Sequence, residues 1–215
     1  MPARRTAALL LLLTVLTSCA PDGERPTESR TVPSRTTAAP SPSVDPASPS
    51  GDPTDSAWVQ LMIPMDEGAV TLLDLAGRKA SDPRLPPWAA RLRTAQAAEL
   101  AELRGLRDRM GLPETDVHKG HDMPGMVTAQ DLQDARTAEG AAFDRLLVTQ
   151  IHDHLRQSQQ VSRSEATAGT RPEATARAQT LATARGKQLA TLTALCAAQA
   201  ADVPEPFACP ADHPV

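Results

Sequence analysis

The sequence predicts an all-α protein, an antiparallel four-helix bundle. The composition points to helices, because the 215 residues include only two Trp, two Phe and no Tyr, whereas helix formers such as Ala, Leu, Arg, Glu and Gln are abundant. Between residues 54 and 200, apolar residues recur at intervals of three and four, which is the pattern of a helix face. Four such stretches joined by short connections and one long central loop predict the bundle.

The first 18 residues are typical of a secretory signal that ends in a lipobox. Arg4 and Arg5 precede an apolar run over residues 7–16, and Leu-Thr-Ser leads directly to Cys19. The run is shorter than the roughly 20 residues that a membrane-spanning helix needs, so we expect it to be cleaved. Lipid on Cys19 would then hold the protein on the extracytoplasmic side of the cell membrane. The alternative is an ordinary signal peptide followed by an incidental cysteine.

The remaining chain divides into a tether, a folded domain and a tail. Residues 19–53 are rich in Pro, Ser and Thr and nearly lack large apolar side chains, which predicts a disordered spacer. We place the helical domain at residues 54–200 and the tail at 201–215. Cys196 and Cys209 form an even pair, so a disulfide is expected in an oxidising compartment. The alternatives are two free thiols or a metal site with His213.

The first two helices follow from apolar stripes and helix-breaking residues. A stripe over residues 58–76 predicts the first helix, with Pro64 inside it as the expected position of a kink. Asp and Pro at residues 82–83 predict a cap and the opening of the second helix. Its stripe covers residues 85–110, and Gly111 is expected to end it.

The last two helices are each expected to begin at a capping box. One stripe covers residues 132–161 and predicts a single third helix, which Gly169 ends. Another stripe, over residues 181–195, predicts the fourth helix. The two capping boxes are Thr128 with Asp131 and Thr170 with Glu173.

Two polar residues stand at inward positions of these stripes. Glu99 lies seven residues after Leu92, and His154 lies seven after Leu147, so both are expected to face the core or its rim. Buried carboxylates and imidazoles need partners, and helical bundles build metal sites from such residues. A hydrogen bond between Glu99 and His154, or exposure at the rim, would explain them equally well. His152 is expected to lie near the opposite face and to be solvated.

The segment HKGHDMPGM, residues 118–126, lies in the long central loop and combines imidazole and thioether groups. His118, His121, Met123 and Met126 are soft or borderline ligands, which favour copper, and Cu(I) especially, over hard cations. The alternative is a solvent-exposed connector in which Gly and Pro make turns and Met fills space under the loop.

Four segments of the sequence form a pattern of their own: LMIPMDEGAV at 61–70, QAAEL at 96–100, MPGMVT at 123–128 and GAAFD at 140–144. Together they resemble the domain-of-unknown-function 305 family, whose members are ferritin-like helical bundles. The resemblance extends over about residues 55–195. It implies two copies of a helical hairpin, each with a Met-Ile-x-His-His element followed by Gln-x-x-Glu. It also implies secretion or lipid anchoring, and a link to copper handling for some members.

The sequence departs from that family pattern at most of the histidine positions. Of the four expected imidazoles only His154 is present, while Gln96 and Glu99 keep the first Gln-x-x-Glu pair. The resemblance therefore implies a weakened metal site in the core, where Asp66 supplies a carboxylate in place of a lost imidazole. The substituted positions are Met65, Asp66, Leu155, Arg185 and Gln188.

Known catalytic signatures are missing from the sequence. It contains no Glu-x-x-His for a di-iron site, no G-x-S-x-G, no P-loop, no dinucleotide fingerprint and no His-Glu-x-x-His. A net charge of −4 without a basic stripe gives no support for nucleic-acid binding. We therefore expect a protein without enzymatic activity.

Two functional hypotheses follow. The first is a lipid-anchored protein that binds or buffers copper. The second is a metal-free scaffold or interaction module of the cell envelope. The expected copper ligands are His118, His121, Met123 and Met126, helped by Asp66, Glu99 and His154.

Overall fold

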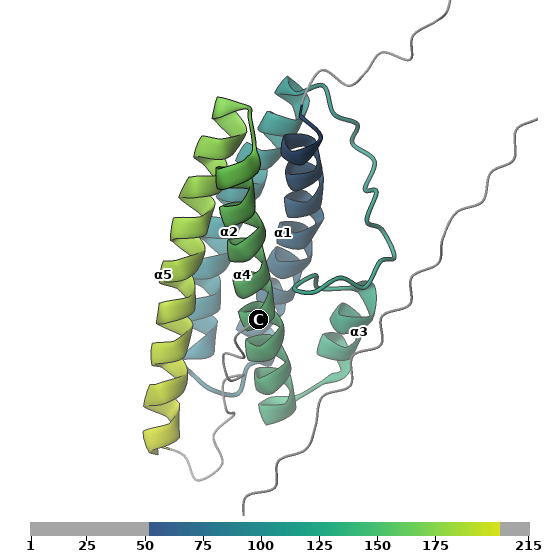
Figure 1. Ribbon diagram of the computed structural model, residues 1–215. Helices are drawn as coiled ribbons and strands as arrows, with labels where there is room; N and C mark the ends of the chain where they lie inside the picture. Colours follow the sequence, from purple (N-terminus) through teal and green to yellow (C-terminus); the bar gives the residue numbers. More distant parts are fainter. Residues whose placement is uncertain (1–51, 203–215) are drawn as a thin grey trace, which may run out of the picture. The chain divides into compact units, whose positions relative to one another are not determined.

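The computed structural model describes residues 52–202, and the side chains of residues 52–197. This part contains five helices and no strand. Four long helices pack side by side as an antiparallel bundle, and a short helix, α3, lies beside it (Figure 1). The all-α prediction is confirmed. The helices are α1 Pro53–Lys79, α2 Leu85–Arg109, α3 Ala129–Thr137, α4 Gly140–Ala168 and α5 Pro172–Asp202.

Several predicted features fall outside the described residues. These are the signal peptide, lipidated Cys19, most of the tether, Cys209 and the tail from residue 203. Cys196 itself is buried and disulfide-bonded. Its pairing with Cys209 stays a prediction. None of the helices in residues 52–202 is long and apolar enough to cross a membrane.

The end of α2 and the start of α3 follow the local sequence, but the predicted start of α2 was wrong. The helix begins at Leu85 and not at Pro83, and its N-cap residue is Arg84, without a side-chain cap. The Asp82 carboxylate accepts the backbone N–H of Arg84 at 2.8 Å in the turn before the helix. Gly111, with φ of 67°, ends α2 in the left-handed conformation that glycine adopts without strain. The capping box of Thr128 and Asp131 is formed in both directions, as predicted.

The expected third helix is in fact two helices, so the prediction of a single helix there was wrong. Ala138 and Glu139 adopt extended backbone conformations between α3 and α4. Lys79, at the end of α1, holds this break: its ammonium donates to the Arg136 carbonyl at 3.1 Å and to the Glu139 carboxylate at 2.5 Å. This tertiary contact replaces the helical hydrogen bonds that the apolar periodicity suggested.

The second predicted capping box does not form at the start of α5. The backbone N–H of Thr170 and that of Arg171 donate instead to the buried carboxylate of Asp55, at 3.2 and 3.0 Å. Glu173 pairs with Arg109 of α2, with Nε to Oε1 at 2.7 Å. The first turn of α1 therefore caps α5 from outside, which a pattern within one segment cannot reveal.

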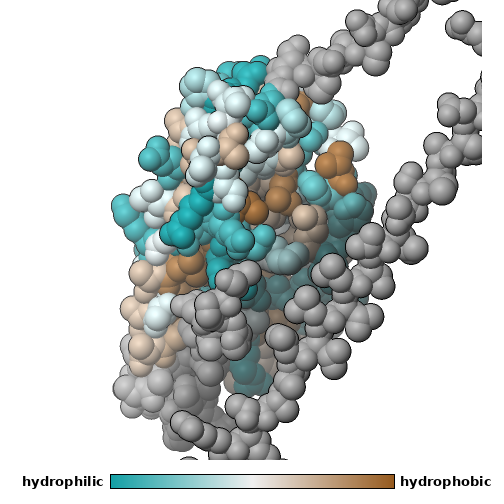
Figure 2. All heavy atoms as spheres, viewed as in Figure 1, coloured by the Kyte–Doolittle hydropathy of each residue, from teal (hydrophilic) through white to brown (hydrophobic). Residues whose placement is uncertain are grey.

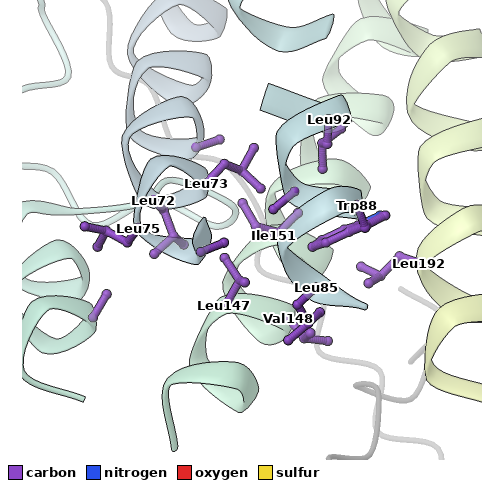
Figure 3. Packing of buried hydrophobic residues seen from close by; sticks show 14 of the residues in the cluster. Leu72, Leu73, Leu75, Leu85, Trp88, Leu92, Leu147, Val148, Ile151 and Leu192 are labelled. Carbon is purple, nitrogen blue, oxygen red and sulfur yellow. The ribbon is translucent and has the colours of Figure 1, made fainter. Parts of the chain in front are cut away.

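The apolar core has two clusters. One gathers Leu72, Phe143, Leu147 and Ile151 with their neighbours, and Figure 3 shows several of these side chains in contact. The other lies around Trp58 and Met62. Along each long helix the two clusters are separated by polar residues, which we call the polar layer. It consists of Asp66, Gln96, Glu99, His154, Ser158, Arg185 and Gln188.

The surface of the helical domain is mostly polar. Figure 2 shows a largely hydrophilic or intermediate face with isolated hydrophobic residues. Among the described side chains, Val117 is the large hydrophobic residue that is exposed, at 51%. Ion pairs such as Arg104 with Glu67, at 2.7 Å, join neighbouring helices across this surface. Each such exposed pair contributes little to the stability of the fold.

A pair of carboxyl groups is buried where α1, α4 and α5 meet. Glu165 is 1% exposed, and neither of its oxygens receives a hydrogen bond from a neighbouring donor. A Cβ on Gly169 would lie 2.6 Å from Asp55 Oδ1 and closer still to Glu165, so the glycine leaves room for both groups. Burial, then the close approach and the charge of the Asp55 carboxyl group, then the charge of Asp52, raise the pKa of Glu165 to about 8.

Protonation of Glu165 should make folding pH-dependent. Because its pKa rises from an ordinary value of 4.5 to about 8, the stabilisation is complete below pH 4.5 and is lost as the pH rises through about 8. Glu165→Gln, which keeps a neutral side chain, should flatten this part of the stability curve. Above pH 8 the variant should be more stable than the wild type by several kcal/mol, since each pKa unit corresponds to about 1.4 kcal/mol. Chemical denaturation between pH 5 and 9 measures the difference.

Glu102→Gln is the matched control, since Glu102 is an exposed glutamate on α2 whose removal should leave the pH trend unchanged. Asp66 is present in all three proteins, so the difference between their curves isolates Glu165. Parallel curves for wild type and Glu165→Gln would show that Glu165 is ionised in the folded protein.

Candidate functional site

The long loop between α2 and α3 runs along the outside of the bundle beside α1 (Figure 1). Near its end, the backbone N–H of Met126 donates to the Met123 carbonyl at 3.0 Å. Pro124 and Gly125 occupy the middle of this turn, and Gly125 has φ of 74°. Pro followed by Gly with positive φ is the pattern of a type II turn. The sequence MPGM therefore fixes the local shape of the loop.

Two glycines allow the turn to pack closely against α1 and α4. A Cβ on Gly125 would lie 2.8 Å from the carbonyl oxygen of Asp153, and a Cβ on Gly68 would lie 2.7 Å from that of Val127. Both distances are shorter than a real Cβ contact allows. The loop can approach the two helices this closely because neither position carries a side chain.

The two loop histidines lie close together. The backbone N–H of His121 donates to the His118 carbonyl at 2.9 Å, and the ring centroids are 6.4 Å apart at an angle of 74°. His118 is half-buried and His121 is exposed. Both line a surface hollow of about 560 Å³ between α1 and the loop, together with Met126. Met123 is half-buried and is not among the lining residues. The acidic lining residues are Glu67, Asp116 and Asp122.

These loop residues fit a soft metal ion better than a hard one. Two imidazoles on one ion with metal–nitrogen bonds of about 2 Å have ring centroids about 5–5.5 Å apart when a third ligand is present, so the observed 6.4 Å requires the two rings to move about 1 Å closer. Among the described residues, no three His, Cys, Asp or Glu side chains form a group that could hold a metal. An ion at His118 and His121 would therefore need a thioether, and Met126 lines the same hollow.

The polar layer brings the other predicted ligands together around Arg185. Nη2 of Arg185 donates to Asp66 Oδ1 at 2.8 Å, and Nη1 donates to Glu99 Oε2 at 2.5 Å. Nη1 also reaches Gln188 Oε1 at 3.1 Å, and Nε donates to Ser158 Oγ at 2.9 Å. The side chains of Arg185 and Asp66 are fully buried. Four helices thus meet at one guanidinium.

The charges in this layer are set by burial. Burial raises the pKa of Asp66 to about 7, although the adjacent Arg185 opposes the shift. Burial and then the charge of Arg185 lower the pKa of His154 to about 3, so this imidazole is neutral at neutral pH. The Gly125 carbonyl opposes that shift, although neither ring nitrogen of His154 makes a hydrogen bond of ordinary geometry.

The inward positions predicted from the stripes are confirmed for two residues. His154 is fully buried, and the Glu99 side chain is 15% exposed. They do not form the simple pair considered above, because Arg185 takes the Glu99 carboxylate and His154 Nε2 lies 3.5 Å from Asp66 Oδ1. The expectation of a solvated His152 was wrong, since this residue is 5% exposed. α4 packs on α1, α3 and α5 and so buries more than one stripe.

The central role of Arg185 was missed at the level of sequence. A signal was available, because Arg185 lies four residues after Leu181 and seven before Leu192, within the apolar stripe. An inward arginine needs acidic partners, and both Asp66 and Glu99 occupy inward positions on other helices.

Six of the seven predicted metal ligands therefore fall into two groups, and Met123 belongs to neither. His118, His121 and Met126 line the hollow beside α1. The other group, Asp66, Glu99 and His154, lies in the polar layer around Arg185. The two groups approach each other where the turn at Gly125 covers His154.

Solved structures share this fold. A presumed secreted DUF305 protein of Streptomyces coelicolor is 17% identical, with a TM-score of 0.59 over 67% of this chain and 93% of its own. The Cu(II)-bound form of CopM is 21% identical, with a TM-score of 0.56 over 66% of this chain and 94% of its own. The Cu(I)-bound form of CopM is 19% identical, with a TM-score of 0.57 over 68% of this chain and 98% of its own.

At these identities the structural likeness establishes the fold. No curated protein matches the chain in sequence. The model of the family described as Domain of unknown function (DUF305) matches residues 55–196, which is more than half of the chain. The protein therefore belongs to the DUF305 family.

Proposed function

We propose that this protein binds copper at the extracytoplasmic side of the cell membrane, held there by lipid on Cys19. The ligands are the imidazoles of His118 and His121, with thioether sulfur from Met126 and Met123. The single observation that carries the proposal is the pair of loop imidazoles, 6.4 Å apart in a hollow that Met126 also lines. Copper buffering suits a shallow site on a surface loop.

Ligand chemistry and family both support copper. Thioether and imidazole together favour Cu(I), and the nearby carboxylates of Glu67, Asp116 and Asp122 add negative charge around a cation. CopM, which shares the fold, is known in Cu(I)-bound and Cu(II)-bound forms. The seating of the turn by Gly68 and Gly125 holds Met126 beside α1, so little ordering is needed when an ion binds.

Removing the two thioethers tests the site. The double variant Met123→Leu/Met126→Leu keeps much of the apolar volume but lacks sulfur, so its melting temperature should stay near that of the wild type. Its affinity for Cu(I) should fall about tenfold or more, whereas Cu(II) binding by His118 and His121 should change less. Competition against a Cu(I) chelator measures the first, and a Cu(II) titration measures the second.

Met110→Leu is the matched control, because Met110 is a half-buried methionine that packs on the core and does not line the hollow. It should bind Cu(I) like the wild type. The double variant His118→Ala/His121→Ala should bind neither Cu(I) nor Cu(II). Equal and negligible copper retention in wild type and all variants would refute copper binding.

Anchoring is tested separately. Cys19→Ala removes the thiol that accepts lipid, so lipid labelling should disappear and the protein should leave the membrane fraction or accumulate as a precursor. Cys209→Ser is the matched control and should be labelled like the wild type. Unchanged labelling of Cys19→Ala would contradict the lipid anchor.

A metal-free scaffold of the cell envelope is the second candidate. It is favoured by one observation, the occupation of the polar layer by Arg185, which gives the bundle core a cation of its own. Under this alternative the loop is a connector and the chelator competition finds no bound copper.

A further inference from the structure

A positively charged groove runs along the surface between α4 and α5. Its volume is about 710 Å³, and its two charged residues are Arg163 of α4 and Lys187 of α5, both exposed. No carboxylate lines the groove, and neither cation has an ion-pair partner within residues 52–197. The remaining lining residues are small or uncharged, such as Thr183 and Ala190. An exposed groove with two cations and no acid favours an anionic occupant.

The floor of this groove is fixed by a contact between the two helices. Nε2 of Gln159 on α4 donates to the Ala182 carbonyl of α5 at 3.1 Å. A Cβ on Gly186 would lie 2.8 Å from the same nitrogen, so a larger residue there would displace the amide. Gly186 therefore lets Gln159 cross between the helices, while the long side chains of Arg163 and Lys187 remain exposed at the surface.

Arg156 extends the positive charge from the groove towards Cys196. It lies seven residues before Arg163, about two turns along the same face of α4. The two helices are antiparallel, so residues nearer the start of α4 lie beside the end of α5. Cys196 belongs to that part of α5, and it is buried and disulfide-bonded. A chain segment held by this disulfide can therefore follow a strip of positive charge into the groove.

The chain beyond Lys187 carries the opposite charge. Residues 188–215 contain no Lys or Arg. Their acidic residues are Asp202, Glu205 and Asp212. The predicted partner of Cys196 is Cys209, and a disulfide holds its two Cα atoms roughly 6 Å apart. Asp212 can extend about 10 Å from Cys209, and Lys187 lies roughly 13 Å before Cys196 along α5. The two long side chains span the remainder, so these charges can meet.

We propose that the groove between α4 and α5 binds the acidic tail of the same chain, residues 203–215, through Lys187 and Arg163. The tail carboxylates are those of Glu205 and Asp212. The proposal depends on the predicted disulfide of the tail and not on copper binding by the loop. The disulfide keeps the tail beside α5, so its effective concentration at the groove exceeds that of a separate acidic partner. The same face of a second copy is disfavoured as the occupant, because two equal positive surfaces repel each other.

Carbodiimide crosslinking of the unreduced full chain tests the contact. The reagent condenses an amine with a carboxylate that touches it, and the lysines of the sequence are Lys79, Lys119 and Lys187. Mass spectrometry should find Lys187 joined to Asp212 or Glu205 within one molecule. Lys187→Arg keeps the charge without a reactive amine and should lose this link. The proposal is overturned if Lys187 forms no link to either tail carboxylate, or forms such links only between two molecules.

Three further variants show whether the groove holds the tail by its charge. Arg163→Gln removes the second cation and should lower the yield of the tail link at Lys187 about threefold. Arg145→Gln is the matched control, because Arg145 is an exposed arginine of α4 that does not line the groove, and its yield should equal that of the wild type. Cys209→Ser releases the tail from α5 and should lower the yield about tenfold. Equal yields in the wild type, Arg163→Gln and Cys209→Ser would reveal chance encounters of the tail with Lys187 and would overturn the proposal.

Discussion

The buried pairing of Arg185 with Asp66 and Glu99 is the constraint on which the middle of the bundle depends. A lone guanidinium or a lone Asp66 carboxylate in this position would be strongly destabilising, because both side chains are fully buried. Together they join α1, α2 and α5, and the bond from Arg185 Nε to Ser158 adds α4. These directional bonds divide two apolar clusters that would otherwise tolerate sliding of one helix along another. The polar layer therefore fixes the register of the four long helices.

The loop depends on the same layer through His154. The turn at Gly125 sits against α4, and its carbonyl acts on an imidazole that burial keeps neutral. A neutral His154 adds no second positive charge beside Arg185, so the guanidinium can hold both carboxylates. The hollow that contains His118, His121 and Met126 thus rests on a core in which one guanidinium pairs with both carboxylates. The predicted copper ligands of the loop thus lie on the surface, and the polar layer beneath them lies in the core.

How far each site was predictable depends on the range of the interactions that form it. Nearby residues fixed the MPGM turn, the glycine that ends α2 and the box at Thr128 and Asp131, so short patterns predicted them. Inward positions of Glu99 and His154 also followed from helical spacing. The partners of these residues did not, because Asp66, Glu99 and Arg185 are far apart in the sequence and meet only when four helices pack. The capping of α5 by Asp55 was missed for the same reason.

The sequence by itself determined the helical class, the approximate helix boundaries and the composition of the His/Met loop, since helix propensity, apolar period and turn chemistry are local properties. Only the tertiary structure decided that the predicted third helix breaks at Ala138 and Glu139, where Lys79 holds the chain. It also decided that six of the seven expected metal ligands divide between a surface hollow and the core, whereas Met123 lies in neither. The physical reason is burial: a guanidinium withdrawn from water takes the nearest carboxylates. Which carboxylates are nearest is settled by packing alone.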